Sequence, residues 1–239
     1  MCLNTRPRTS AASTYAGGRR GKERAASLRA EQRLAAGGRR LPRPGAALHA
    51  VNVRRIAGQT LIFYGDGKGK TSAAFGVALR AVGRGWKVLM IQYTKMGEWP
   101  KGEPMGEING ARRLAPDFEV ISTGIGFVNI LGDTFTFEEH RKAAQDGLEL
   151  YRDKAASGAY DLIILDEAIG AVSQGQWDLE QLLDVIRNKP RELNLLITGH
   201  DDDKKFIDQV IAIADLATEM RKVKHPFDEG HQARKGLDY

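Results

Sequence analysis

The residues best suited to chemistry form a short stretch rich in glycine and lysine, Gly65-Asp66-Gly67-Lys68-Gly69-Lys70-Thr71. Glycines permit a turn in which several backbone N–H groups face one anion. A lysine at the end of such a turn can hold the outer phosphates of a nucleotide, and the hydroxyl that follows can bind Mg²⁺. The spacing predicts a phosphate loop that includes Ser72, with Lys70 on the phosphates and Thr71 on the metal.

The phosphate-loop pattern departs from its strict form at one position. The strict form has a glycine five residues before Gly69, where this chain has Tyr64. One alternative is a glycine-rich turn that binds no ligand. A dinucleotide fingerprint fits less well, because Ser72 stands where its third glycine belongs. We therefore expect a variant phosphate loop.

A second chemical feature is the acidic pair Asp166-Glu167, which follows the apolar run Leu162–Leu165. Carboxylates at the end of a buried strand can bind Mg²⁺ directly or through water. Taken alone, the pair is also compatible with an ordinary strand end. Because it lies about 95 residues after the loop, we predict a metal site made of Thr71, Asp166 and Glu167.

Short apolar runs separated by helical stretches must position these residues. The expected strands are 60–64, 86–93, 118–122, 162–165 and 193–198, with 216–220 as a possible sixth. Continuous apolar strands that alternate with helices indicate a parallel sheet covered on both faces. The predicted fold class is α/β, a P-loop NTPase-like parallel sheet of about five to six strands with helices on both faces.

Helix start signals and long loops complete this outline. The expected helices are 72–82, one from the Thr136–Glu139 capping box to about 156, 179–187 after Asp178, and 204–214 after Asp201 or Asp202. Two long loops, 94–117 and 123–135, should leave the carboxyl edge of the sheet, where α/β proteins bind ligands.

The N-terminal residues 1–57 differ in composition from the rest of the chain. Thirteen basic and two acidic residues precede Gly58, so this stretch carries +11 and the remainder −5 of the net charge of +6. Such an Arg-, Ala- and Gly-rich segment does not bury enough surface to fold alone, although 22–36 could form a short helix. It fits a solvated leader, an organelle transit peptide, a mis-set start or, less well, a nucleic-acid-binding arm.

Residues 58–239 resemble the P-loop family of ATP:corrinoid adenosyltransferases. The matching stretches occur in the family's order and cover about three quarters of the chain. They are GDGKGKTSAA (65–74), ALRAVGRG (78–85), IQY (91–93), WPKGE (99–103), LDE (165–167), TG (198–199), VKHPFDEG (223–230) and GLDY (236–239). Two of them, VKHPFDEG and GLDY, carry most of the specificity, because generic P-loop ATPases lack them.

The resemblance implies that Co(I) of a reduced corrinoid attacks the ribose 5′-carbon of ATP and expels triphosphate. Lys68, Lys70 and the loop amides would then hold the leaving group, and Mg²⁺ would lie on Thr71 and Glu167. Arg80 would reach toward the ribose. His200 replaces the arginine that the family usually has after Thr-Gly, and a protonated histidine could act similarly, unless the position is a solvated loop.

The resemblance also implies an apolar corrinoid site, with side chains crowding the lower face of the cobalt. Phe127 and Ile125 stand where better-known members carry a Phe and a Trp, so Ile125 lacks the expected ring. Trp99 and His225 would line the same site, His225 as part of a closing segment. Phe135 and Phe137 either compensate for the missing ring or pack in the core.

The expected partners are a reduced corrinoid (cobalamin or a precursor), an electron-donating reductase or flavodoxin-like protein, and a second copy in a homodimer. No apolar run reaches the 18 or so residues of a membrane span, and a single cysteine fits a reducing compartment. We expect a cytoplasmic enzyme, with organelle import left open. The alternative is a P-loop ATPase that binds nucleic acid or regulates, which the acidic folded part disfavours.

Overall fold

The computed structural model describes residues 57–98, 102–126, 128, 133–201 and 206–238. Within these residues six strands form one sheet in the order β3-β2-β4-β5-β1-β6, and every neighbouring pair is parallel. The strands are β1 (Thr60–Tyr64), β2 (Val88–Gln92), β3 (Phe118–Ser122), β4 (Leu162–Asp166), β5 (Asn194–Gly199) and β6 (Leu216–Glu219). All six predicted strands are confirmed, the sixth included.

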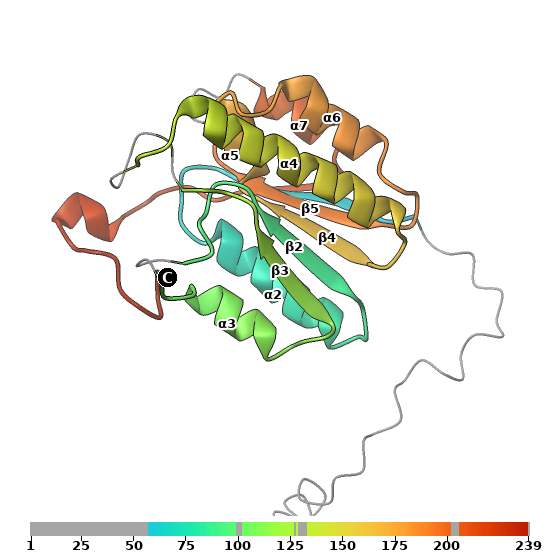
Figure 1. Cartoon of the computed structure of the whole chain (residues 1–239), viewed down its shortest axis with the longest axis horizontal. Helices are drawn as coiled ribbons and strands as arrows, with labels where there is room; N and C mark the ends of the chain where they lie inside the picture. The colour runs from blue at the N-terminus through green and yellow to red at the C-terminus, as the bar shows by residue number, and fades with distance from the viewer. Residues whose placement is uncertain (1–56, 99–101, 127, 129–132, 202–205, 239) are drawn as a thin grey trace, which may run out of the picture. The chain divides into compact units, whose positions relative to one another are not determined.

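Helices cover both faces of the sheet, as the continuous apolar strands require. Figure 1 shows α2 (Lys70–Val82) and α3 (Gly106–Arg112) on one face. The other face carries α4 (Phe137–Ala156), α5 (Ala168–Ser173), α6 (Leu179–Arg187) and α7 (Ile207–Ala212). A short 3-10 helix, η1 (Pro226–Glu229), lies in the C-terminal segment. The predicted fold class is confirmed.

The helix starts follow local chemistry. Thr136 and Glu139 form the predicted capping box of α4, with the Glu139 N–H donating to the Thr136 hydroxyl and the Thr136 N–H to the Glu139 carboxylate. At α6 the Gln181 side chain accepts from the Asp178 N–H at 2.9 Å. The Asp201 carboxylate accepts from the N–H of Phe206 and of Ile207, which caps α7.

Two helices were not predicted. The stretch 94–117 is not a continuous loop, because α3 forms within it. It is short and contains Gly106 and Gly110, which lower helix propensity, so its pattern is weak. The helix α5 follows β4 directly, and its six residues are almost all apolar, which gives no amphipathic period to detect. The predicted start of α7 at residue 204 lies outside the described residues.

Two apolar clusters fill the space between the layers. The larger one lies under α4, α5, α6 and α7, where the Tyr93 and Trp177 rings meet edge to face at 4.7 Å. The Trp177 indole N–H donates to the Ala144 carbonyl at 2.9 Å, so its one polar atom is satisfied. The smaller cluster lies under α2 and α3. None of the described helices is both long and apolar enough to cross a bilayer.

The close contact of α4 with the end of β2 predicts an unusual response to glycine replacement. A Cβ on Gly147 would lie 2.6 Å from the Thr123 hydroxyl oxygen and 2.8 Å from the Tyr93 ring. We expect Gly147→Ala to lower the free energy of unfolding by about 1–3 kcal/mol, because overpacking outweighs the better helix propensity of alanine. Urea denaturation measures the change.

The matched control is Gly110→Ala in α3, where an added Cβ meets no atom within 4 Å. It should stabilise the protein by about 0.5–1 kcal/mol. If Gly147→Ala stabilised it equally, the packing of α4 on Tyr93 would not be as tight as described.

Candidate active site

The phosphate loop connects β1 to α2, as the sequence predicted. Gly65 and Gly69 both have φ of 110°, a conformation that L side chains rarely adopt. Lys70 opens α2, and its Nζ donates to the carbonyls of Gly65 at 2.7 Å and Gly67 at 2.9 Å. The ammonium group therefore lies inside the turn, where the N-terminus of α2 adds partial positive charge.

The chain after β6 forms hydrogen bonds with the phosphate loop. The Gly67 N–H donates to the Met220 carbonyl at 2.7 Å, and the Lys222 N–H donates to the Asp66 carboxylate at 2.8 Å. That backbone hydrogen bond lowers the pKa of Asp66. A Cβ on Gly67 would lie 2.8 Å from backbone atoms of Met220 and Arg221, so only glycine fits here. Gly67 therefore contributes close backbone approach rather than an N–H turned toward a ligand.

The Asp166 carboxylate lies at the centre of the site and is fully buried. Four side chains donate to it. They are Thr71 at 3.0 Å, Thr198 at 2.7 Å, Gln92 at 3.2 Å and Lys95 at 3.0 Å. The network satisfies both carboxylate oxygens and joins α2, β2, β4 and β5.

Glu167 adjoins Asp166 but has a different environment. Its φ of 64° makes it the one non-glycine residue of the described chain with positive φ. Its carboxylate faces the cavity at the carboxyl edge, and within the described residues no hydrogen bond reaches that carboxylate. Burial raises its pKa, and so does the neighbouring Asp166, while Lys95, Lys70 and His200 lower it less. Of the two carboxylates, Glu167 is the one open to a new ligand.

Lys95 is the main functional candidate that the sequence reasoning missed. Its Nζ donates to the Thr71 hydroxyl at 2.8 Å and to Asp166, and lies 3.9 Å from the Glu107 carboxylate. Burial lowers the pKa of Lys95, but the carboxylates of Asp166, Glu167 and Glu107 more than compensate, so the net pKa is raised. Its position just after the second strand was the only available signal.

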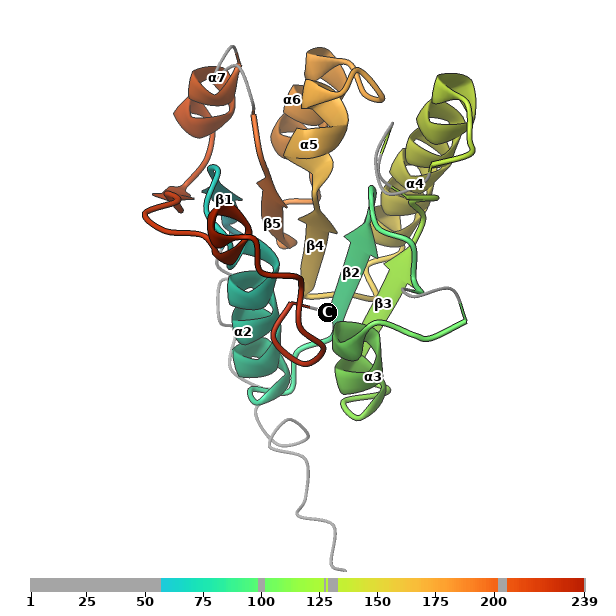
Figure 2. The same cartoon turned by 90° about the vertical axis from the view of Figure 1, so that its left-hand side faces the viewer.

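A cavity of about 620 Å³ opens between the phosphate loop, α3 and the C-terminal segment. Figure 2 shows this segment, in red, passing in front of α2 toward α3. The lining residues are Lys68, Gly69, Lys70, Thr71, Ser72, Phe75, Lys95, Gly106, Glu107, Glu167, Gly236, Leu237 and Asp238. Asp238 pairs with Lys68, and that hydrogen bond lowers the pKa of Asp238.

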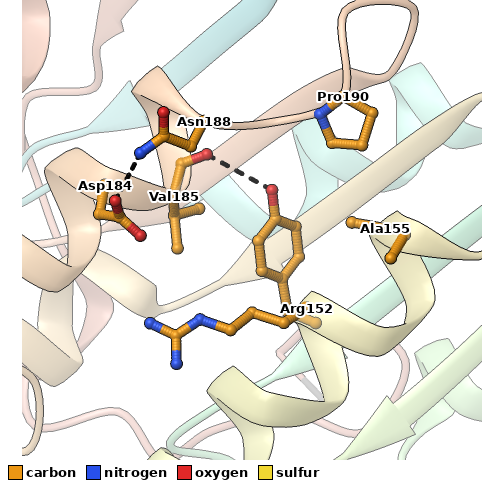
Figure 3. Close-up of a pocket in the computed structure, with 8 residues that line it drawn as sticks. Arg152, Ala155, Asp184, Val185, Asn188 and Pro190 are labelled. Atoms are coloured by element: carbon orange, nitrogen blue, oxygen red, sulfur yellow. Dashed lines mark hydrogen bonds between the residues drawn. The ribbon is translucent and has the colours of Figure 1, made fainter.

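A second cavity, of about 200 Å³, lies between α4 and α6 (Figure 3). Its polar contacts are structural. The Tyr151 hydroxyl donates to the Val185 carbonyl at 3.4 Å and the Asn188 amide to Asp184 at 2.5 Å. Burial raises the pKa of Tyr151 to about 12. The larger cavity therefore carries the chemistry.

The other predicted site residues differ in burial and in their position relative to the cavity. His200 follows β5, and its proximity lowers the pKa of both Glu167 and Asp66. His225 is half-buried and stacks on Phe227, with ring centroids 5.6 Å apart. Ile125 is half-buried in the loop after β3. Arg80 lies in the last turn of α2 and is exposed, about 15 Å along the helix axis from Lys70, so the described chain does not bring it to the cavity.

Only some of the aromatic residues expected at the corrinoid site are among the described residues. Trp99 and Phe127 lie outside the described residues. Phe135 and Phe137 are 43% and 41% exposed, so neither packs in the core. Both rings therefore present exposed apolar surface at the amino end of α4.

The donor set around Glu167 fits a hard divalent cation. It offers the Glu167 carboxylate, the Thr71 hydroxyl and, behind them, Asp166, all oxygen donors. Among the described residues no group of three or more His, Cys, Asp or Glu could hold a metal by itself. Mg²⁺ bound through one or two carboxylates and nucleotide phosphates is compatible with such a site.

The sequence of this chain is similar to a known protein family over most of its length. The family model described as ATP:corrinoid adenosyltransferase BtuR/CobO/CobP matches residues 57–239. The chain is 34% identical over 182 residues to the corrinoid adenosyltransferase of Escherichia coli strain K12, covering 76% of this chain and 86% of that protein. Identity to the corrinoid adenosyltransferase CobA of Salmonella typhimurium is 34% over 191 residues, with the same coverage.

Among solved structures, the flagellar accessory protein FlaH of Methanocaldococcus jannaschii matches with a TM-score of 0.43 and 12% identity, covering 69% of this chain and 71% of that one. A similarity at this level carries no argument about function.

The buried acidic pair predicts a stability gain on neutralisation. Because burial and the neighbouring Asp166 raise the pKa of Glu167, its ionised form destabilises the fold, and this cost grows as the pH rises from the unfolded-state pKa through the raised folded-state pKa. We expect Glu167→Gln to increase the free energy of unfolding by about 0.5–2 kcal/mol at neutral pH. Thermal unfolding followed by circular dichroism measures it.

The exposed Glu138 provides the control, since Glu138→Gln should change stability by no more than about 0.5 kcal/mol. A stability loss in Glu167→Gln would mean that attraction to Lys95 and Lys70 outweighs burial and repulsion.

Proposed function

The chain belongs to the ATP:corrinoid adenosyltransferase family and is a corrinoid adenosyltransferase, and we propose that it transfers the 5′-deoxyadenosyl group of ATP to Co(I) of a reduced corrinoid in the synthesis or salvage of adenosylcobalamin. In this reaction a cobalt–carbon bond forms at C5′ as the bond from C5′ to its oxygen breaks. The electron pair of that bond leaves with inorganic triphosphate. The nucleophile has no proton to lose, so the site needs no general base.

One observation carries the proposal: the phosphate loop and Glu167 of the acidic pair face the same 620 Å³ cavity. Lys68 and Lys70 line it from the loop, Glu167 from the end of β4 and Lys95 from the end of β2. Cations that hold three phosphoryl groups stabilise the charge that develops on the leaving triphosphate. Attack at C5′ requires such stabilisation, because the triphosphate is then the leaving group.

Mg²⁺ fits the proposal as a ligand of Thr71 and Glu167, with Asp166 behind them. It would neutralise part of the charge of the triphosphate. The protein's own contribution is orientation. Asp166 holds the Thr71 hydroxyl through a 3.0 Å hydrogen bond, and the backbone of Glu167 is fixed by a 3.0 Å hydrogen bond to Thr198.

The remaining site residues belong to the proposal by resemblance to the family. Gly65, Asp66, Gly67, Gly69, Ser72, Arg80 and His200 would complete the ATP site. Trp99, Ile125, Phe127 and His225 would contact the corrinoid, with Phe127 crowding the lower face of the cobalt. The exposed rings of Phe135 and Phe137 add apolar surface at the end of α4.

The proposal includes partners that this reaction needs. Co(I) requires an electron donor, and we propose a reductase or flavodoxin-like protein for that role. We also propose a homodimer in the cytoplasm.

Product analysis tests the reaction. Purified protein with ATP, Mg²⁺ and chemically reduced cobalamin should give the light-sensitive spectrum of an alkylcobalamin together with inorganic triphosphate. Release of ADP and orthophosphate without alkylcobalamin would instead support a P-loop ATPase, and binding of ATP with no product would indicate a binding module.

Removal of the loop ammonium provides a residue-level prediction. We expect Lys70→Ala to lower kcat by about 10²–10³-fold, because Lys70 lies inside the turn that holds the leaving group. Single-turnover formation of the alkylcobalamin measures the loss. Lys142→Ala, which removes an exposed lysine paired with Asp146 on α4, is the control and should retain activity. A loss of less than about tenfold in Lys70→Ala would exclude Lys70 from the mechanism.

A further inference from the structure

Lys95 contacts the same atoms that a divalent cation at this site would use. Its Nζ lies 2.8 Å from the Thr71 hydroxyl oxygen and 3.0 Å from the Asp166 carboxylate. Its side chain is only 15% exposed, and the Asp166 side chain is fully buried. An ammonium group and a metal ion cannot both lie against the Thr71 oxygen, because two cations at such a separation repel strongly in a buried site.

The surroundings of Lys95 show where its ammonium can go. Glu107 of α3 lies 3.9 Å away, on the cavity side, and Lys95, Glu107 and Lys70 all line the same cavity. A lysine has a flexible four-carbon stem, so its ammonium can shift by a few ångströms within a cavity without backbone movement. Lys95 can therefore exchange Thr71 for an anionic ligand in the cavity.

We propose that Lys95 competes with the divalent cation for Thr71 and Asp166, and that binding of the metal with its polyphosphate moves the Lys95 ammonium onto the phosphate oxygens. The proposal rests on the proposed function for the identity of that polyphosphate. It makes Lys95 a switchable cation that orders the Thr71 hydroxyl and Asp166 when no metal is bound. The same cation then becomes part of the charge that holds the leaving group.

A purely structural lysine would behave differently. If Lys95 only satisfied the buried Asp166, its removal would disorder the network, and binding of metal and of polyphosphate would both weaken. If Lys95 instead competes with the metal and then moves onto the phosphates, its removal changes the two affinities in opposite directions. Removing the charge should strengthen binding of the metal alone and weaken binding of the polyphosphate.

The test measures two affinities in Lys95→Gln, a neutral variant whose amide can still donate to Asp166. Mn²⁺ binding without nucleotide or corrinoid, followed by electron paramagnetic resonance, should tighten at least tenfold. Binding of inorganic triphosphate at saturating Mg²⁺, followed by calorimetry, should weaken about tenfold, since a hydrogen bond to a charged group is lost. Neither readout requires adenosyl transfer, so failure of the proposed reaction does not affect them.

Two variants serve as controls. Lys95→Arg keeps the positive charge and should not tighten Mn²⁺ binding. Lys87→Gln removes a lysine that pairs with Asp117 at the start of β2 and should change neither affinity. Lys95→Met supplies a second neutral side chain if Lys95→Gln does not fold. Mn²⁺ affinity that is unchanged or weaker in the neutral variant would overturn the proposal, and so would unchanged triphosphate affinity.

Discussion

The buried carboxylate of Asp166 is the constraint on which the site depends. A fully buried charge is costly unless donors surround it, and here four side chains from three separate parts of the chain donate to it. Thr71 belongs to the phosphate loop, Gln92 and Lys95 to the end of β2, and Thr198 to β5. Because the donors come from three separate elements, satisfying this one group fixes the relative positions of the loop and three strand ends.

The phosphate loop is held from its outer side as well. β6 pairs with β1, and the chain that leaves β6 reaches the loop through Met220 and Lys222. The same chain later returns, and Asp238 pairs with Lys68 at the cavity. The C-terminal motif GLDY therefore lies beside the loop, where Gly236, Leu237 and Asp238 line the same cavity as Lys68 and Lys70.

The fold was predictable because its signals are local. Strands such as Val88–Gln92 are continuous apolar runs, and α4 begins at a capping box. The missed parts lack local signals. Helix α3 contains two glycines, and Lys95 is a single lysine in a loop whose partner Asp166 is 71 residues away. Whether a lysine is solvated or contacts a buried carboxylate depends on strand order, which periodicity does not reveal.

The adjacent carboxylates of Asp166 and Glu167 lie in different surroundings because their backbone conformations differ. Asp166 ends β4 in extended conformation and turns into its four donors, whereas the next residue adopts φ of 64° and faces the cavity. Such a conformation costs about 1–2 kcal/mol in a residue other than glycine, and the surrounding structure must enforce it. The Glu167 N–H donates to the Thr198 hydroxyl at 3.0 Å, and β5 packs closely on the helix that follows, since a Cβ on Gly199 would lie 2.7 Å from the Gly170 nitrogen. The strain at Glu167 thus separates a structural acid from one available to a ligand.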